Sequence, residues 1–255
     1  IPTMHRLLVP AEFLRADNVT LPPEAAHHLK VVRPRDGELI ELFDGAGGSR
    51  AYRFCADAAG RSPRTASASL AAAGEIVLAP PRPYGITLFA CVTKGARWDW
   101  TVEKATELGA SRIVPVLSAR CIVHVDRKDR ASKRERWMRI AEEAARQSDA
   151  KWLPEVHEPV DFPAALALSG ECTCFVGALT SPPSMPLLES VSGHIGEGNG
   201  DYGLFVGPEG DFTPDELAAL LKVAHPASFG PTILRAETAA MFGLSVLSAA
   251  LAGSR

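Results

Sequence analysis

The sequence predicts an α/β protein of two domains, a small β domain followed by a larger domain built around a mostly parallel sheet. Three observations support this prediction. The 255 residues are more than one ordinary domain needs. Short apolar segments separated by turns fill the first 70 or so residues, and apolar runs alternate with helical stretches from residue 86 onward. We expect the two domains to cover residues 4–74 and 75–255.

The N-terminal part has the pattern of short strands. The apolar stretch 39–43 runs into the turn-rich Asp44-Gly-Ala-Gly-Gly48, and Tyr52-Arg-Phe54 follows. The segment 56–83 is dominated by Ala, Ser, Gly and Pro, and proline stiffens the chain and removes backbone donors. We therefore place the domain boundary within residues 72–84.

The C-terminal part begins with a predicted β-α-β unit. An apolar run at 86–92 precedes a helical stripe of Trp98, Val102 and Ala105, which stops at Gly109 before a second apolar run at 113–117. The later predicted elements are a helix through Trp137, Ile140 or Ala141, and Ala144, strands at 173–179, 204–206 and 232–234, a helix at 214–223 and a final helix.

Composition excludes several classes of protein. Apolar residues make up 46% and charged residues 22%, which is typical of a soluble globular protein. The longest apolar runs, at 86–92 and 239–252, are shorter than the roughly 18 to 20 residues of a membrane span. Five cysteines are an odd number, so we expect no disulfide framework and a cytoplasmic protein.

Charge is unevenly distributed along the chain. Residues 91–151 carry 14 Lys/Arg against 9 Asp/Glu, whereas residues 152–255 carry 3 against 12. Clustered cations attract phosphate locally even when the whole protein is acidic, so the middle segment is a candidate surface for a polyanion. A solvated helix face is the alternative for its densest run, 127–139.

The most informative motif lies at residues 204–216. An apolar strand runs into Gly207-Pro-Glu-Gly210, and Thr213-Pro-Asp-Glu216 has the residues of a capped helix start. Glycines at a strand end let the backbone approach a ligand, and open α/β sheets bind ligands at the carboxyl ends of their strands. We interpret the motif as a ligand-binding turn; the alternative is a plain strand-to-helix turn.

A second cluster, Gly230-Pro-Thr-Ile-Leu-Arg235-Ala-Glu-Thr-Ala-Ala240, puts a cation, an acid and a hydroxyl at the entry of the last helix. A cation there opposes the helix dipole unless an anion or an acid such as Glu237 or Glu209 compensates. Arg235 therefore either serves a ligand or forms a structural ion pair with a glutamate.

No metal site is expected. The fingerprints of dinucleotide-binding, P-loop and zincin sites are missing from the sequence. Cys172-Thr-Cys174 has the wrong spacing for zinc, so core cysteines are the better interpretation. The adjacent His27 and His28 diverge by about 100° on a helix, which favours a cap or an RNA contact over metal ligation.

Taken together, these motifs resemble the ribosomal RNA small-subunit uracil-N3 methyltransferases (the RsmE family) of the SPOUT superfamily. The paired signature is Gly207-Pro-Glu-Gly210 with the Gly230–Ala239 cluster. Further matching segments are His27-His28-Leu-x-Val-Val-Arg33, Leu42-Phe-Asp-Gly45, Lys94-Gly95, Glu103-Lys-Ala-Thr-Glu-Leu-Gly109, Ser118-x-Arg-Cys121, Arg136-Trp137 through Gln147, and Pro154-Glu155.

This resemblance implies a fold, a cofactor and partners. We expect a PUA-like RNA-binding β-barrel at the N-terminus, and a C-terminal SPOUT domain with a deep trefoil knot that binds S-adenosylmethionine. The implied partners are 16S ribosomal RNA or the small ribosomal subunit and a second copy of the chain, with no metal and no membrane. The implied reaction is methylation of N3 of a uridine.

The resemblance also assigns the site residues. Arg235, Glu209 and Glu237 are the catalytic candidates, with Arg235 stabilising charge on the uracil and one glutamate acting as base. The cofactor-binding candidates are Leu179, Thr180, Val206, Gly207, Pro208, Glu209, Gly210, Gly230, Ile233, Leu234, Arg235, Thr238 and Ala239. The RNA-binding candidates are His28, Arg33, Lys94, Arg97 and Arg120.

The chain departs from the family pattern at a few positions. Asp211 and Asp149 stand where the family has glycine, Thr232 and Ala150 where it has arginine, and Ala236 where it has threonine. Two alternatives therefore stay open, a SPOUT methylase acting on a 2′-hydroxyl or on transfer RNA, and an RNA-binding protein of this fold without catalytic activity.

Overall fold

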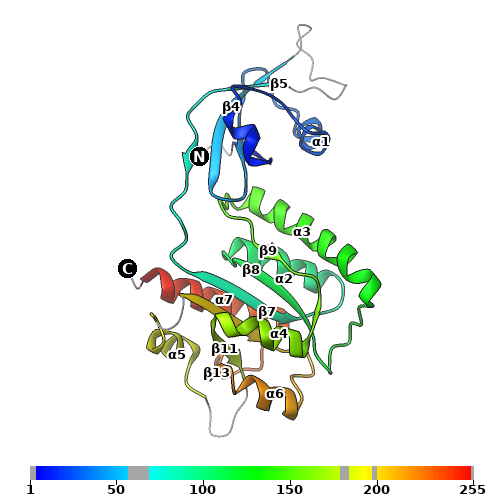
Figure 1. Cartoon of the computed structure of the whole chain (residues 1–255), viewed down its shortest axis with the longest axis vertical. Helices are drawn as coiled ribbons and strands as arrows, with labels where there is room; N and C mark the ends of the chain where they lie inside the picture. The colour runs from blue at the N-terminus through cyan, green and yellow to red at the C-terminus, as the bar shows by residue number, and fades with distance from the viewer. Residues whose placement is uncertain (1–3, 57–68, 179–183, 197–199, 254–255) are drawn as a thin grey trace. The chain divides into compact units, whose positions relative to one another are not determined.

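The computed structural model describes residues 4–56, 69–178, 184–196 and 200–253 (Figure 1). The chain divides into two compact units, one of Ile1–Pro81 with Ala145–Leu153 and the other of Arg82–Ala144 with Pro154–Arg255. The division thus falls in the proline-rich segment 80–83. The sequence pattern gives no sign that residues 145–153 belong with the N-terminal unit.

In the N-terminal unit, six described strands form a sheet in the order β1-β3-β4-β5-β2, with β6 paired to β4. Only β1 and β3 are parallel. The predicted strand at 39–43 is confirmed as β3, and Tyr52-Arg-Phe54 lies in β4. The elements are β1 (His5–Leu8), β2 (Asn18–Thr20), α1 (Pro23–Val32), β3 (Leu39–Phe43), β4 (Gly48–Cys55), β5 (Ser69–Ala72) and β6 (Val77–Leu78), with a 3₁₀ helix at Ala11–Arg15.

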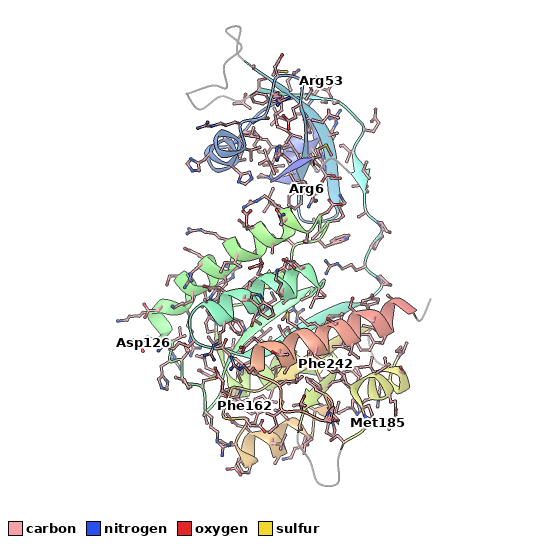
Figure 2. The ribbon with its side chains drawn as sticks, turned by 180° about the vertical axis from the view of Figure 1, so that it is seen from behind. Arg6, Arg53, Asp126, Phe162, Met185 and Phe242 are labelled. Atoms are coloured by element: carbon pink, nitrogen blue, oxygen red, sulfur yellow. The ribbon has the colours of Figure 1, made fainter. Side chains whose placement is uncertain are left out.

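Arg6 explains why residues 145–153 belong to this unit. Its buried guanidinium, labelled in Figure 2, donates from Nη1 to the Ala145 carbonyl (2.8 Å) and from Nη2 to the Ala150 carbonyl (3.1 Å). It also forms an ion pair with Glu41. The Leu153 amide donates to the Gly45 carbonyl at 2.8 Å, so backbone bonds fasten the same segment to the turn before β4.

In the C-terminal unit, seven described strands form a parallel sheet in the order β10-β8-β7-β12-β11-β13, with β9 paired to β8. The strands are β7 (Gly85–Cys91), β8 (Arg112–Leu117), β9 (Glu155–Val156), β10 (Val160–Asp161), β11 (Thr173–Gly177), β12 (Asp201–Val206) and β13 (Ala224–Ala227). The helices are α2 (Ala96–Glu107), α3 (Arg130–Gln147), α4 (Phe162–Leu168), α5 (Leu187–Gly193), α6 (Pro214–Leu220) and α7 (Ala236–Gly253), with 3₁₀ helices at Arg127–Asp129 and Ser169–Glu171. The end of α3, from Ala145 onward, belongs to the N-terminal unit. The predicted α/β class with a parallel sheet is confirmed.

Helix α7 packs against this sheet. Figure 1 shows it in red beside β7 and α2, and it also contacts β12. A Cβ added at Gly243 would lie 2.5 Å from the Leu204 side chain, so glycine is required for the close approach of α7 to β12. The helix has 18 residues with a mean hydropathy of 1.4, so the expectation that no apolar run reaches membrane-spanning length was wrong. One face of the helix, with Ala240, Leu244, Leu247 and Leu251, is buried in this unit, and 33% of the 18-residue window is buried.

One predicted strand is also wrong. Residues 232–234 form no strand, and Ile233 is 85% exposed. The last strand is instead β13, Ala224-His-Pro-Ala227, which pairs with β11 at the edge of the sheet. Pro226 makes this strand hard to predict from the sequence, because proline argues against a strand inside a sheet. It is tolerated mainly in an edge strand, where the missing N–H costs no hydrogen bond to a neighbouring strand.

Candidate functional site

The candidate site lies along the carboxyl ends of the parallel strands, and this side of the sheet is its carboxyl edge. Because the strands run in the same direction, the segments that follow them leave from the same edge. These segments are 92–95 after β7, 118–121 after β8, 207–213 after β12 and 228–235 after β13. Ligands of open α/β sheets bind at this edge. Both motifs singled out in the sequence therefore lie at this edge, after β12 and β13, which are separated by β11.

The Gly207–Gly210 turn is rigidly held. Its first half is anchored by the buried side chains of Val206 and Pro208, and the Asp211 amide donates to the Pro208 carbonyl at 2.9 Å. The helix start that follows is the predicted one. Thr213 Oγ1 accepts from the Glu216 amide (3.2 Å), and the Thr213 amide donates to Glu216 Oε2 (2.9 Å), which completes a capping box. The turn therefore presents backbone groups on a fixed support.

The segment 228–235 leads into α7 through Gly230, whose φ of +110° is a conformation that other residues rarely adopt. Within the described residues, the exposed Arg235 has no ion-pair partner, so the geometry does not support a structural pair with Glu209 or Glu237. Glu237, in the first turn of α7, buries its Oε2 without a hydrogen-bond partner among the described residues. A buried acceptor without a hydrogen bond is costly, so this carboxylate oxygen is a candidate ligand contact.

Glu209 is in a different situation. Its Oε1 accepts from Arg97 Nη1 at 3.0 Å, which ties the 207–213 segment to the first turn of α2. The pair is partly exposed, so it contributes little to stability, but it fixes the direction of the carboxylate. Of the two predicted bases, Glu237 is the one with an unengaged buried oxygen.

Comparison with known proteins identifies the family. A family model described as an RNA methyltransferase domain matches residues 80–248. The ribosomal RNA small subunit methyltransferase E of Synechocystis sp. is 30% identical over 258 residues, covering 97% of this chain and 78% of that protein. The chain belongs to the ribosomal RNA small subunit methyltransferase E family. The Mycobacterium bovis member is 32% identical over 227 residues, covering 88% of this chain and 83% of that one.

Solved structures of related enzymes share the whole fold. A Neisseria gonorrhoeae ribosomal RNA small subunit methyltransferase E bound to S-adenosylmethionine has a TM-score of 0.79 at 29% identity and covers 96% of this chain and 97% of its own. A Legionella pneumophila methyltransferase in complex with the same cofactor has a TM-score of 0.81 at 27% identity, covering 97% and 98%.

The backbone explains two departures from the family sequence pattern. Asp211 and Asp149 stand where the family has glycine, and both have positive φ, +59° and +58°. Aspartate enters this region more readily than most residues because its short side chain can bond locally. Asp211 does so, since its Oδ1 accepts from the Phe212 amide at 2.7 Å. A positive φ is thus adopted at both positions without glycine. Nothing in the structure explains Thr232 or Ala236.

A buried network of Cys91, Ser118 and Cys121 supports the same edge. Cys91 Sγ donates to Ser118 Oγ (3.3 Å), and Ser118 Oγ lies 3.4 Å from Cys121 Sγ, which also accepts from the Ser118 amide (3.4 Å). The hydrogen bond from the Cys91 thiol, with those from Ser118, lowers the pKa of Cys121 to about 6, although burial opposes this. The same coupling and burial raise the pKa of Cys91.

We therefore expect Cys121 to titrate as an acid of unusually low pKa. Thiolate absorbance at 240 nm should show a component with a midpoint near pH 6 that disappears in Cys121→Ala. A free cysteine has a pKa of about 8.5. Between pH 6 and this value the thiol is therefore protonated in the unfolded chain and ionised in the folded one. The free energy of unfolding of the wild type should rise relative to that of the variant as pH increases through this range. The advantage is lost as pH falls through 6. Identical titrations of the two proteins would contradict the expectation.

The remaining predicted residues are spread over both units. Leu179 and Thr180 lie outside the described residues. His28 is in α1, and Arg33, which ends that helix, adopts a φ of +53°. Lys94 is exposed after β7, and Arg120 donates to backbone carbonyls of the 207–213 segment. Thr93, which the sequence did not single out, is a further candidate, because its hydroxyl is buried and has no partner among the described residues; only its position beside Lys94-Gly95 could have pointed to it.

Proposed function

We propose that this chain transfers the methyl group of S-adenosylmethionine to N3 of a uridine in 16S ribosomal RNA, in the cytoplasm. The observation that carries the proposal is the convergence of the Gly207–Gly210 turn and the 228–239 segment at one sheet edge. The residues present fit a polar cofactor, because Thr93 Oγ1 and Glu237 Oε2, in segments that leave this edge of the sheet, are buried acceptors without partners in the described part of the chain.

The chemistry assigns a role to each charged residue. S-adenosylmethionine supplies an electrophilic methyl group whose bond to sulfur breaks with the electron pair passing to sulfur, so the leaving group needs no acid. N3 of neutral uracil carries a proton, which must leave as the N–C bond forms. Glu237 is the proposed acceptor of that proton. Arg235, exposed and unpaired within the described residues, is proposed to stabilise the negative charge that then develops on the uracil carbonyls.

The N-terminal unit is proposed to be a PUA-like RNA-binding domain, and the C-terminal unit a SPOUT domain with a deep trefoil knot. An unpaired uridine must be presented for N3 to be reached, because that atom faces the pairing partner in a duplex. Exposed cations in both units, among them Arg33 and Lys94, are the proposed phosphate contacts.

We propose further that two copies associate through the outer face of α7. Phe242, labelled in Figure 2, is 39% exposed on this helix and packs on Phe229 at 5.6 Å between ring centroids. Phe242→Glu should therefore shift the protein from dimer to monomer in analytical ultracentrifugation, because a charge cannot be buried unpaired in an apolar interface. The matched control is Leu221→Glu, of similar exposure (42%) at the end of α6, which should stay dimeric. A monomeric wild type would refute the dimer.

The decisive experiment for the function is methylation of 16S ribosomal RNA and of small subunits taken from cells that lack this chain. With labelled S-adenosylmethionine and full-length protein, nucleoside mass spectrometry should find 3-methyluridine as the product. A 2′-O-methylated nucleoside, or label entering transfer RNA instead, would replace the proposed target. RNA binding without transfer of label to any RNA would leave only a binding protein of this fold.

A further inference from the structure

Side chains that have no role in the proposed reaction form hydrogen bonds between two segments of the candidate site, 118–121 and 207–213. Arg120, in the 118–121 segment, donates from Nη1 to the carbonyl oxygens of Gly210 (2.9 Å) and Phe212 (3.3 Å). In the opposite sense, Glu216 Oε1 accepts from the Ala119 amide at 2.8 Å. A Cβ added at Gly210 would lie 3.5 Å from Arg120 Cβ, so the Arg120 side chain lies close against the turn.

Each of the two hydrogen-bonded segments is also held by contacts of its own. On one side, the Cys121 amide donates to the Ser118 carbonyl (3.1 Å), and both side chains are buried in the thiol network described above. On the other side, Phe212 is buried and its ring packs on Phe162 of α4 at 5.8 Å between centroids. Arg120 therefore connects the 118–121 segment to the 207–213 segment, which includes the turn proposed to bind the cofactor.

Glu216 has a double function in this arrangement. One carboxylate oxygen closes the capping box on Thr213, and the other reaches the 118–121 segment. A carboxylate is suited to this because each of its oxygens can accept a separate N–H bond. A helix cap alone needs only one of them.

We infer that Arg120 and Glu216 are positioning residues that hold the 207–213 segment in its cofactor-binding shape. Arg120, taken from the sequence as a cation for RNA phosphate, is thereby given a role toward S-adenosylmethionine. The inference rests on the proposed function for the identity of the ligand. It does not rest on it for the hydrogen bonds between the two segments, which Arg120 and Glu216 make within the chain itself.

The test compares Arg120→Ala, Arg120→Lys and Glu216→Gln with the matched control Lys94→Ala, an exposed cation on the neighbouring 92–95 segment. Calorimetry on the full chain should find S-adenosylmethionine binding about 10-fold weaker in Arg120→Ala, which corresponds to about 1.4 kcal/mol. Glu216→Gln should weaken it several-fold. Arg120→Lys keeps the charge but not the planar fork, so it should restore only part of the affinity. Lys94→Ala should bind the cofactor normally.

The RNA readout separates positioning from phosphate binding. The salt dependence of 16S RNA binding, at saturating cofactor, should be unchanged in Arg120→Ala and reduced by about 1 in its slope in Lys94→Ala. Steady-state kinetics of Arg120→Ala should show a raised KM for S-adenosylmethionine with kcat within about 3-fold of wild type, since saturation restores the shape of the turn. Wild-type cofactor affinity together with a reduced salt slope in Arg120→Ala would overturn the inference.

Hydrogen exchange makes the result independent of the proposed function. Without any ligand, amides of 207–213 should exchange about 10-fold faster in Arg120→Ala than in wild type and at the wild-type rate in Lys94→Ala. If the wild type binds no S-adenosylmethionine, the proposed function fails. The exchange rates still show whether Arg120 and Glu216 hold the 207–213 segment in place. Unchanged exchange in Arg120→Ala and Glu216→Gln refutes the inference. Melting temperatures confirm that the variants compared are folded.

Discussion

Arg235→Ala is expected to lower the single-turnover rate of methylation about 100-fold, the scale seen when one preorganised electrostatic donor is removed. The affinity for RNA should stay within a few-fold, because Arg235 acts on charge that appears only as N3 loses its proton. The melting temperature should barely change, since the exposed guanidinium has no ion-pair partner in the described residues. The measurement is the rapid-quench rate with enzyme in excess over RNA.

Arg235→Lys is the control for geometry. It retains the positive charge, but a compact ammonium does not reproduce the planar fork of a guanidinium, so little of the rate should return. Loss of thermal stability and of cofactor binding together, with an unchanged rate per bound cofactor, would instead give Arg235 a structural role. A normal single-turnover rate in Arg235→Ala would remove it from the catalytic residues.

Glu237→Gln is the second change for which we expect a large effect, a rate reduction of about 100-fold or more at neutral pH. General bases contribute on this scale, and glutamine preserves the shape of the side chain while it cannot take a proton. The rate of the variant should rise steeply with pH, because hydroxide then removes the N3 proton in place of the carboxylate. A pH series of single-turnover rates measures this.

Glu209→Gln is the matched control, because it makes the same chemical change in the other candidate base. Glu209 already accepts from Arg97 at 3.0 Å, so we expect its loss to alter the rate by less than 10-fold. The reverse order of effects, with Glu209→Gln the more damaged variant, would move the role of base to Glu209. Equal and small effects in both would mean that solvent takes the proton.

Much of the fold could be predicted from the sequence because its signals are local. The strand at 39–43, the helical stripe of Trp98, Val102 and Ala105, and the helix start with its N-cap at Thr213 each depend on residues a few positions apart. The position of the Gly207–Gly210 turn at a strand end also follows from such a pattern. These signals are sufficient to place the candidate site at the carboxyl edge of a parallel sheet.

Tertiary structure alone decided the partners of the charged residues. Arg97 and Glu209 are 112 positions apart, Arg120 and Gly210 are 90, and Arg6 and Ala145 are 139, and no local pattern specifies which of many cations meets which acceptor. Sequence reasoning therefore found Arg120 as a cation but not the carbonyls it holds. For the same reason it placed the last strand at 232–234, since the pairing of β13 with β11, not the propensity of Ala224-His-Pro-Ala227, makes that segment a strand.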